Sequence, residues 1–227
     1  MRIIEPSVEI LYPPNYQQML THTELAARTC YKSEDRIKDG SAVELIKRLI
    51  TSGHHSVLEH ISISVRFICD RGISHELVRH RLCSFSQEST RYCNYLGEKF
   101  GRELTFIRPC FWSPISHQFA RWKNAMHDAE FAYFDLLEDG ASPQEARSVL
   151  PNSLKTEIVV TANIRQWRTM FLQRCAPAAH PQMRQVMLAL LGEFLAKYNI
   201  FFQDLYDLYV DWIGGFTNKG WQLAEVK

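Results

Sequence analysis

The stretch ISISVRFICDRGISHELVRHRLCSFSQESTRY, residues 61–92, decides the fold. Its first part, residues 61–68, places Ile61, Ile63, Val65 and Phe67 on one face and serine or arginine on the other. That period of two predicts a half-buried strand. A short helix is predicted over residues 73–82, followed by a polar, irregular stretch through Tyr95. The segment therefore predicts a strand that leads into a charged helix and then a loop.

The flanking sequence predicts an alternation of helices and strands. Strands are expected over residues 2–12, 104–107 and 155–162, and helices over residues 17–32, 164–175 and 182–210. Capping boxes at Ser41/Glu44 and Ser142/Glu145 predict helices that end near Gly53 and Leu150, and Ser113-Pro114 predicts the start of a long helix to Glu138. Without repeats or a linker, this pattern favours one α+β domain over residues 1–227. The apolar residues of the long helices are expected in the core or at a subunit interface.

The composition is that of a soluble globular protein. Of 227 residues, 46% are hydrophobic and 22% charged, and the net charge of +1 does not suggest a nucleic-acid or membrane surface. The N-terminus does not read as a signal peptide, and no stretch approaches about 18 apolar residues, the length of a membrane span. The six cysteines include no CxxC pair, which predicts reduced thiols in a cytoplasmic protein.

The segment from Glu76 to Tyr92 holds most of the candidate functional side chains. It holds three arginines, His80 and two acids, and on a helix Glu76, Arg79 and His80 would share a face. The hydroxyl-rich residues 84–90 favour a loop, and such loops surround anions while arginine forks bind phosphate. The segment predicts a nucleotide-phosphate site, with a solvated, salt-bridged helix end as the alternative.

Two further clusters bear on this choice. Residues 53–60 hold three histidines and Glu59, but their spacing matches no zincin or inverzincin motif, and no metal site is predicted. Arg168 and Arg174 would lie on nearly opposite faces of one helix, so both cannot decorate the same solvated side. A buried arginine there needs an anionic partner.

The run Arg79-His80-Arg81, followed after seven residues by Ser89, resembles the Arg-His-Arg-x7-Ser signature of flavin-dependent thymidylate synthases. Arg91-Tyr92 follows the serine as that signature expects. The similarity extends to Ala26-Ala27-Arg28, to residues 53–60, to Arg147-x-x-Leu150-Pro151 and to Asn163-x-Arg165 with Arg174. It thus covers most of the chain.

The resemblance implies a mixed sheet flanked by helices, and a homotetramer with FAD and dUMP held where subunits meet. It implies methylation of dUMP to dTMP, with methylenetetrahydrofolate as one-carbon donor, FAD as hydride carrier and NADPH as reductant. It implies no cysteine nucleophile. From the charge balance, neither nucleic acid nor a membrane is expected as a partner. Without an evident Ser–His–Asp arrangement, Ser89 is interpreted as a binding group.

The resemblance also assigns site residues. Positions expected to contact the cofactor are Ser56, Arg79, His80, Arg81, Gln87, Asn163 and Arg165, with His54 and Tyr92 near the flavin ring and the folate. Positions expected to hold dUMP are Glu76, Arg79, Gln87, Glu88, Ser89, Thr90, Arg91 and Arg147. Arg174 is expected to face the uracil ring and favour its ionised N3, as the catalytic group.

The chain departs from the family pattern at three places. Ser86-Gln87 stands where many members have Asn-Glu, Glu76 where many have Gln, and residues 179–184 differ enough that they receive no role. Two rival classes remain, a nucleic-acid-binding module that uses the arginine segment and a metal hydrolase that uses the histidines. A yellow colour from bound flavin would distinguish the first function from both rivals.

Overall fold

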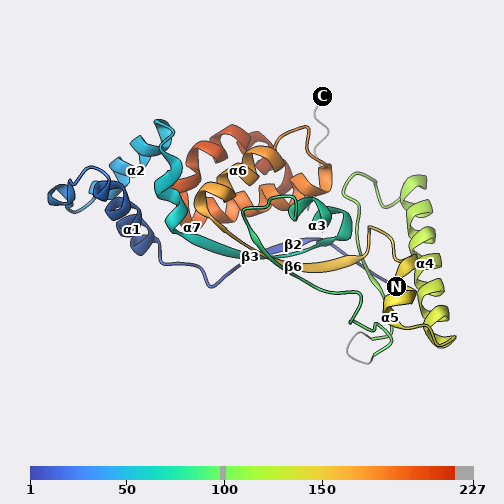
Figure 1. Ribbon diagram of the computed structural model, residues 1–227. Coiled ribbons are helices and arrows are strands. Elements are labelled where there is room, and N and C mark those ends of the chain that lie inside the picture. Colours follow the sequence, from blue (N-terminus) through green and yellow to red (C-terminus); the bar gives the residue numbers. More distant parts are fainter. Residues whose placement is uncertain (98–100, 218–227) are drawn as a thin grey trace.

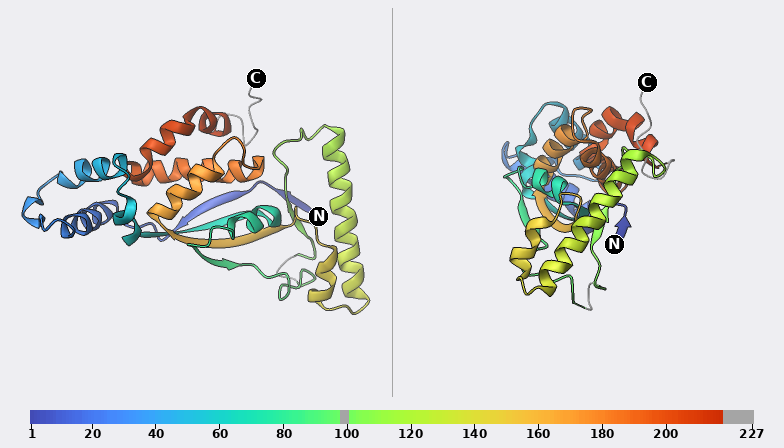
Figure 2. Two further views of the ribbon diagram at one scale, coloured as in Figure 1. Left: turned by 45° about the horizontal axis from the view of Figure 1, so that its top comes forward. Right: turned by 90° about the vertical axis from the view of Figure 1, so that its right-hand side faces the viewer.

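A computed structural model of the chain describes residues 1–97 and 101–217. The molecule is elongated, with a sheet in the middle, α1 and α2 at one end and α4 and α5 at the other (Figures 1 and 2). In chain order the elements are β1 (Arg2–Ile4), β2 (Ser7–Leu11), α1 (Tyr16–Thr29), η1 (Glu34–Arg36), α2 (Ser41–Thr51), η2 (His55–His60), β3 (Ser62–Asp70), α3 (Arg71–Leu77), β4 (Ser84–Gln87), β5 (Thr105–Ile107), α4 (His117–Glu138), α5 (Pro143–Ala146), η4 (Arg147–Val149), β6 (Lys155–Asn163), α6 (Ile164–Arg174) and α7 (Pro181–Thr217).

The main sheet has four antiparallel strands in the order β2-β3-β6-β4, and a separate parallel pair joins β1 to β5. Alternate residues of β3 and β6, among them Ile63, Phe67 and Val160, are buried in the core that α6 and α7 cover. The predicted α+β class with helix-flanked sheets is confirmed, and the two kinds of strand pairing are divided between the two sheets.

The predicted strand over residues 2–12 is two strands in two sheets. Glu5-Pro6 separates them, because proline lacks the N–H that a ladder needs and fixes its own φ. Arg2 then pairs with Thr105 in the small sheet, whereas Ser7 pairs with Ile68 in the large one. Because of this break, residues 2–4 pair in the small sheet and residues 7–11 in the large one.

The described residues form two hydrophobic clusters. The larger joins the sheet to α1, α2, α6 and α7, and in it the Trp167 indole N–H donates to the Ile63 carbonyl at 3.0 Å. The smaller packs α4 against β1 and β5 around Tyr133 and Phe106. Whether both belong to one domain stays a prediction.

Of the three predicted helix starts, the one at Ser41 lacks its capping box, the one at Ser113 is wrong and the one at Ser142 is confirmed. Gly40 precedes α2 with φ of 77°, and the Ser41 hydroxyl donates to Glu24 and Lys38 instead of closing a capping box. Ser116, three residues beyond Ser113, caps α4 by accepting from Phe119 N–H. The capping box at Ser142 is present, because the Glu145 carboxylate accepts from the Ser142 N–H at 2.8 Å.

The C-terminal helix differs from expectation in two respects. It is kinked at Tyr198, where φ is −138° and ψ is 40°, so the predicted single helix is two segments. Over Pro181–Asp211 it is long and apolar enough to cross a membrane, contrary to the expectation that no stretch approaches that length. Because 56% of its apolar window is buried, as in a core helix, it is weak support for a membrane span.

Candidate active site

Arg174, the last residue of α6, makes three hydrogen bonds to the end of α3 and the turn that follows it. Its Nε donates to His80 Nε2 at 2.9 Å, and its terminal nitrogens donate to the Glu76 carboxylate at 2.7 Å and the Glu76 carbonyl at 3.3 Å. The helix predicted over residues 73–82 ends at Leu77, so Glu76, Arg79 and His80 do not share a helical face. Turn bonds from Arg79 N–H to Glu76 and from His80 N–H to Leu77 bring His80 back toward Arg174.

His80 is held as a neutral acceptor. Its side chain is only 6% exposed, and burial, followed by the neighbouring Arg174 charge, lowers its pKa from 6.5 to about 4. Arg174 can only donate, so Nε2 carries the lone pair and Nδ1 the proton. The predicted contact of His80 with flavin is therefore not made by Nε2, which Arg174 occupies.

A cavity of about 390 Å³ lies next to this cluster and shares Glu76 with it. Its other lining residues are Asp70, Gly72, Ile73, His75, Asn152, Ser153, His180 and Gln182. The Asp70 carboxylate accepts from Ile73 N–H at 2.8 Å and from the Gln182 amide at 2.7 Å, and burial raises its pKa. Sequence reasoning assigned none of these eight, although Asp70 lies directly after a predicted strand, where a helix cap is typical.

The hydroxyl-rich segment is half strand and half loop. Residues 84–87 form β4, which pairs with β6 from Ser84↔Thr161 to Gln87↔Ile158, so the prediction of an irregular stretch is wrong there. The Gln87 amide donates inward to the hydroxyls of Ser74 at 2.8 Å and Thr156 at 3.2 Å. This pairing fixes where the loop begins.

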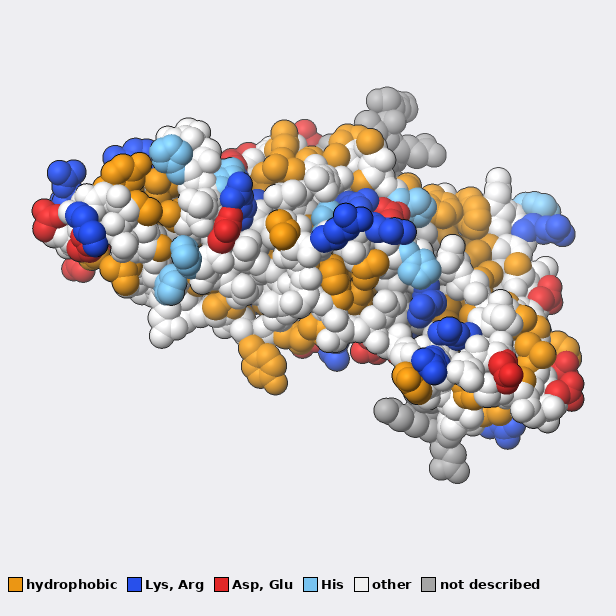
Figure 3. Space-filling view, in the orientation of Figure 1, with side chains coloured by type: hydrophobic (Ala, Val, Ile, Leu, Met, Phe, Trp, Pro, Cys, Tyr) orange, Lys and Arg blue, Asp and Glu red, His pale blue; other side chains and the backbone are white. Residues whose placement is uncertain are grey.

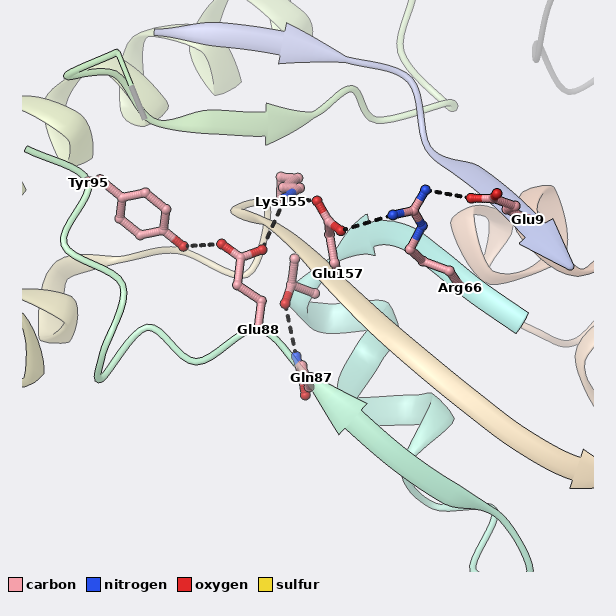
Figure 4. A network of polar contacts seen from close by, with 8 residues as sticks. Glu9, Arg66, Gln87, Glu88, Tyr95, Lys155 and Glu157 are labelled. Atoms are coloured by element: carbon pink, nitrogen blue, oxygen red, sulfur yellow. Dashed lines mark hydrogen bonds and ion pairs between the residues drawn. The ribbon is translucent and has the colours of Figure 1, made fainter. Parts of the chain in front are cut away.

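A chain of ion pairs and hydrogen bonds holds Glu88 (Figure 4). Its two carboxylate oxygens accept from Lys155 Nζ at 3.0 Å and Tyr95 OH at 2.8 Å. Lys155 also pairs with Glu157 at 2.6 Å, and that carboxylate continues the chain to Arg66. Glu88 therefore positions the loop, and both of its oxygens already have partners.

The loop then turns toward α5. Ser89 O accepts from Tyr92 N–H, and Arg91 lies over the Tyr92 ring at 5.3 Å from its centroid. Arg91 Nε donates to the Gln144 side chain at 3.2 Å, which ties the loop to the helix that runs into Arg147. The structure thus brings Arg91 close to the segment that carries the second predicted phosphate ligand. Thr90, by contrast, is buried.

Three of the predicted ligands are exposed arginines. The guanidinium groups of Arg79, Arg81 and Arg147 form no ion pair or hydrogen bond with any residue that the structure describes. Figure 3 shows Lys and Arg side chains gathered with histidines in the middle of this face. Such guanidinium groups are available to an anionic ligand.

The remaining predicted cofactor residues meet where η2 approaches α6. Asn163 caps α6 by accepting from Gln166 N–H at 2.8 Å, and Arg165 forms an ion pair with Glu59 of η2. His54 and Ser56 are exposed at the start of η2. The ion pair therefore brings η2 and the start of α6, two segments distant in sequence, together.

Arg168 has a structural role. It is buried, and its guanidinium binds the Asp204 carboxylate of α7 through both terminal nitrogens. The expectation that a buried arginine in α6 needs an anionic partner is confirmed. Within residues 1–97 and 101–217, no group of three His, Cys, Asp or Glu side chains has the arrangement of a metal site.

Comparisons with known proteins agree on one family. Residues 15–198 match the family model described as "Thymidylate synthase complementing protein". Flavin-dependent thymidylate synthases from Geobacter sulfurreducens and Pyrococcus furiosus are 34% and 31% identical, over 74% of this chain in each case and over 73% and 69% of theirs. A crystal structure described as a UMP/dUMP methylase, PolB from Streptomyces cacaoi, bound with 5-Br dUMP, superposes with a TM-score of 0.72. That likeness covers 92% of this chain and 98% of the other at 23% identity.

Proposed function

This chain belongs to the flavin-dependent thymidylate synthase family, and we propose that it converts dUMP to dTMP with methylenetetrahydrofolate as one-carbon donor and NADPH as reductant. The balanced reaction consumes one proton and releases tetrahydrofolate and NADP⁺. The observation that carries the proposal is the Arg174 guanidinium, anchored by Glu76 and His80 at the edge of a cavity.

Arg174 is the catalytic group of this proposal. A guanidinium has five N–H donors, and three of them hold Glu76 and His80, which leaves two for a ligand. Two fixed donors against the pyrimidine would stabilise negative charge at N3 and raise the electron density at C5. Because the donors are already oriented, they need no reorganisation as that charge develops.

The flavin would be held at the surface next to this cluster. When bound, FAD supplies the hydride chemistry that no amino-acid side chain provides. The residues fit its pyrophosphate, because Arg79 and Arg81 are exposed and have no carboxylate partner among the described residues. Ser56 of η2 and Arg165 of α6 would contribute further contacts. The amide N–H₂ of Asn163, which donates to no described residue, would join them. His54 and Tyr92 would lie near the flavin ring and the folate.

The dUMP would lie between Arg174 and the loop that follows β4. Glu76 would contact the base, and Arg91 and Arg147 would bind the phosphate as a pair of forks. Ser89 and the backbone of Gln87, Glu88 and Thr90 would complete the loop contacts. We assign Gln87 and Glu88 to backbone contacts because their side chains already bind neighbours.

We further propose a cytoplasmic homotetramer in which neighbouring chains complete each site. In support, β3 and β6 present half-buried side chains such as Arg66 and Val159 on the face opposite α6 and α7, a face on which Figure 1 places no helix. Antiparallel sheets commonly leave one face solvated, and such a face is open to packing by another chain.

A visible absorption spectrum of the purified protein tests the cofactor first, because bound oxidised flavin is yellow. Oxidation of NADPH is then followed with and without dUMP and methylenetetrahydrofolate, and dTMP is identified by chromatography. A nucleic-acid-binding module or a metal hydrolase would give colourless protein, even after incubation with FAD, and no dTMP. That result would reject the proposal.

A further inference from the structure

A second cavity, of about 420 Å³, lies between α1 and α2 at the end of the molecule away from Arg174. We call it the α1–α2 pocket, and it is lined by the end of α1, the loop after it, α2 and the residues up to His54. Its volume is within the usual range for a small-molecule site. Of its lining residues, only His54 has a role in the function proposed above.

The pocket carries uncompensated positive charge. Three arginines line it, and Arg28 is neutralised by the buried Glu24, which binds it at 2.7 Å. The guanidinium groups of Arg36 and Arg48 form no ion pair or hydrogen bond within the described part of the chain. Glu44, the acid on α2, pairs instead with Lys47 at 3.6 Å. Two free guanidinium groups therefore face one cavity.

The same pocket has an apolar side. Ala27 and Leu49 line it and are buried, and Leu45 is half-buried beside them. The Tyr31 ring, also in the lining, is 73% exposed. Exposed aromatic rings next to guanidinium groups suit ligands that combine a flat ring with negative charge.

We propose that the α1–α2 pocket binds the p-aminobenzoyl-glutamate part of the folate co-substrate, and this rests on the proposed function. The benzoyl ring packs against Tyr31 and Leu49. One of the two free guanidinium groups, Arg36 or Arg48, binds the first glutamate, and the other is left for a carboxylate further along a polyglutamate tail. His54 lines the same pocket and is assigned to the neighbourhood of the reacting folate. His54 therefore lies between the bound folate tail and the reacting end of the folate.

Phosphate groups share this anionic chemistry, so FAD and NADPH are the competing ligands. The dUMP phosphate is a poorer candidate. Its proposed ligand Arg91 binds Gln144 of α5, which lies at the opposite end of the molecule from α1 and α2 (Figure 1). The test therefore measures each ligand separately.

The experiment is calorimetric titration of the FAD-loaded protein with p-aminobenzoyl-glutamate and p-aminobenzoyl-triglutamate, which measures the pocket independently of turnover. We expect the triglutamate to bind about tenfold more tightly, as one added charge-assisted contact allows. Arg36→Gln and Arg48→Gln should each remove most of that difference, and high salt should reduce it in the parent protein. Lys47→Gln makes the same charge change next to Arg48 on α2 but outside the pocket, and it should behave as the parent protein does.

Steady-state assays complete the test. The Michaelis constant for methylenetetrahydrofolate should rise about tenfold in Arg36→Gln/Arg48→Gln, with kcat, flavin content and the constants for dUMP and NADPH unchanged. Loss of FAD, or a change confined to NADPH, would assign the pocket to a phosphate and overturn the proposal. Equal binding of both tails by parent and variants would overturn it too. A parent protein that binds the tails but forms no dTMP would instead contradict the proposed function.

Discussion

Arg174 and His80, 94 positions apart, are joined by a 2.9 Å hydrogen bond from the guanidinium Nε to the imidazole Nε2. The bond connects the end of α6 to the turn after α3 and uses a histidine that burial keeps neutral. A protonated imidazole has no lone pair and would repel the guanidinium. The orientation of the catalytic arginine therefore depends on the protonation state of one buried ring.

Arg174→Ala should lower kcat by about 10² or more, the scale for losing one preorganised electrostatic donor. Arg174→Lys should recover only part of this, because an ammonium lacks the planar fork that binds Glu76 and His80 together. Flavin absorbance should stay near normal in both variants, and Gln173→Ala, its exposed neighbour on α6, serves as the control. Near-normal kcat with no bound FAD would make Arg174 a cofactor anchor instead.

The pH dependence of kcat should carry the His80 titration. The folded-state pKa is about 4 and the ordinary value is 6.5, so the unfolded chain binds more protons between these two values. The contribution of neutral His80 to the free energy of unfolding is therefore fully present above pH 6.5 and falls as the pH is lowered toward 4. Activity falls with it as His80 becomes protonated. His80→Gln, which keeps an acceptor but cannot titrate, should lose this acidic limb of the profile. An unchanged limb in that variant would assign it to another group.

Glu76→Gln tests the departure at the uracil site. The amide oxygen still accepts from Arg174, but the negative charge beside the pyrimidine is removed, which favours the N3 anion. We expect kcat to stay the same or rise, by up to about tenfold, the effect of about 1.4 kcal/mol. A fall of two orders of magnitude, with folding intact by circular dichroism, would mean that the carboxylate itself takes part in proton transfer.

Arg91→Ala and Arg147→Ala should each weaken dUMP binding by about 1.5–3 kcal/mol, the range for a charge-assisted contact. Titration of the flavin spectrum with dUMP measures this. Deoxyuridine, which lacks the phosphate, should bind parent and variants alike. Arg121, another exposed arginine, on α4, provides the matched alanine control. Unchanged affinity in both single variants would rule out the phosphate assignment.

Replacing each of the six cysteines by serine, one at a time, should leave kcat within about tenfold. Burial raises the pKa of the thiols of Cys69 and Cys175 and brings that of Cys110 to about 12 and that of Cys83 to about 11. Such thiols are almost wholly protonated at neutral pH and are poor nucleophiles. A loss of several orders of magnitude in any folded variant would show that the mechanism needs a cysteine.

The sequence predicted the elements better than their junctions. The strands over residues 61–68, 104–107 and 155–162 and the helix over residues 164–175 are confirmed, because their periodicity reflects one buried face each. β4 was missed because three of its four residues are polar, Phe85 being the exception, and only pairing with β6 makes them a strand. Tertiary context overrode local propensity there.

The site shows the same division. The motif identified the family and the residue types, and periodicity suggested that an arginine of α6 is buried. The sequence did not predict the hydrogen-bond partners of these residues. Arg174 binds His80, and Glu88 binds Lys155 and Tyr95, across segments that are distant in sequence. Asp70, His180 and Gln182 were missed for the same reason, because the cavity they line exists only in the folded chain.

The separation of β1 from β2 at Glu5-Pro6 has a consequence for how the molecule unfolds. Residues 2–4 are anchored in the small sheet and residues 7–11 in the large one, so a few residues bridge the two hydrophobic clusters. The connection at Glu5-Pro6 is short, so neither hydrophobic cluster can open fully while its strand, β1 or β2, stays paired, unless this connection is stretched. The amide hydrogens of Ile4 and Val8 would then exchange with solvent at similar rates, and local fluctuations of α4 would be coupled to the sheet that carries the catalytic turn.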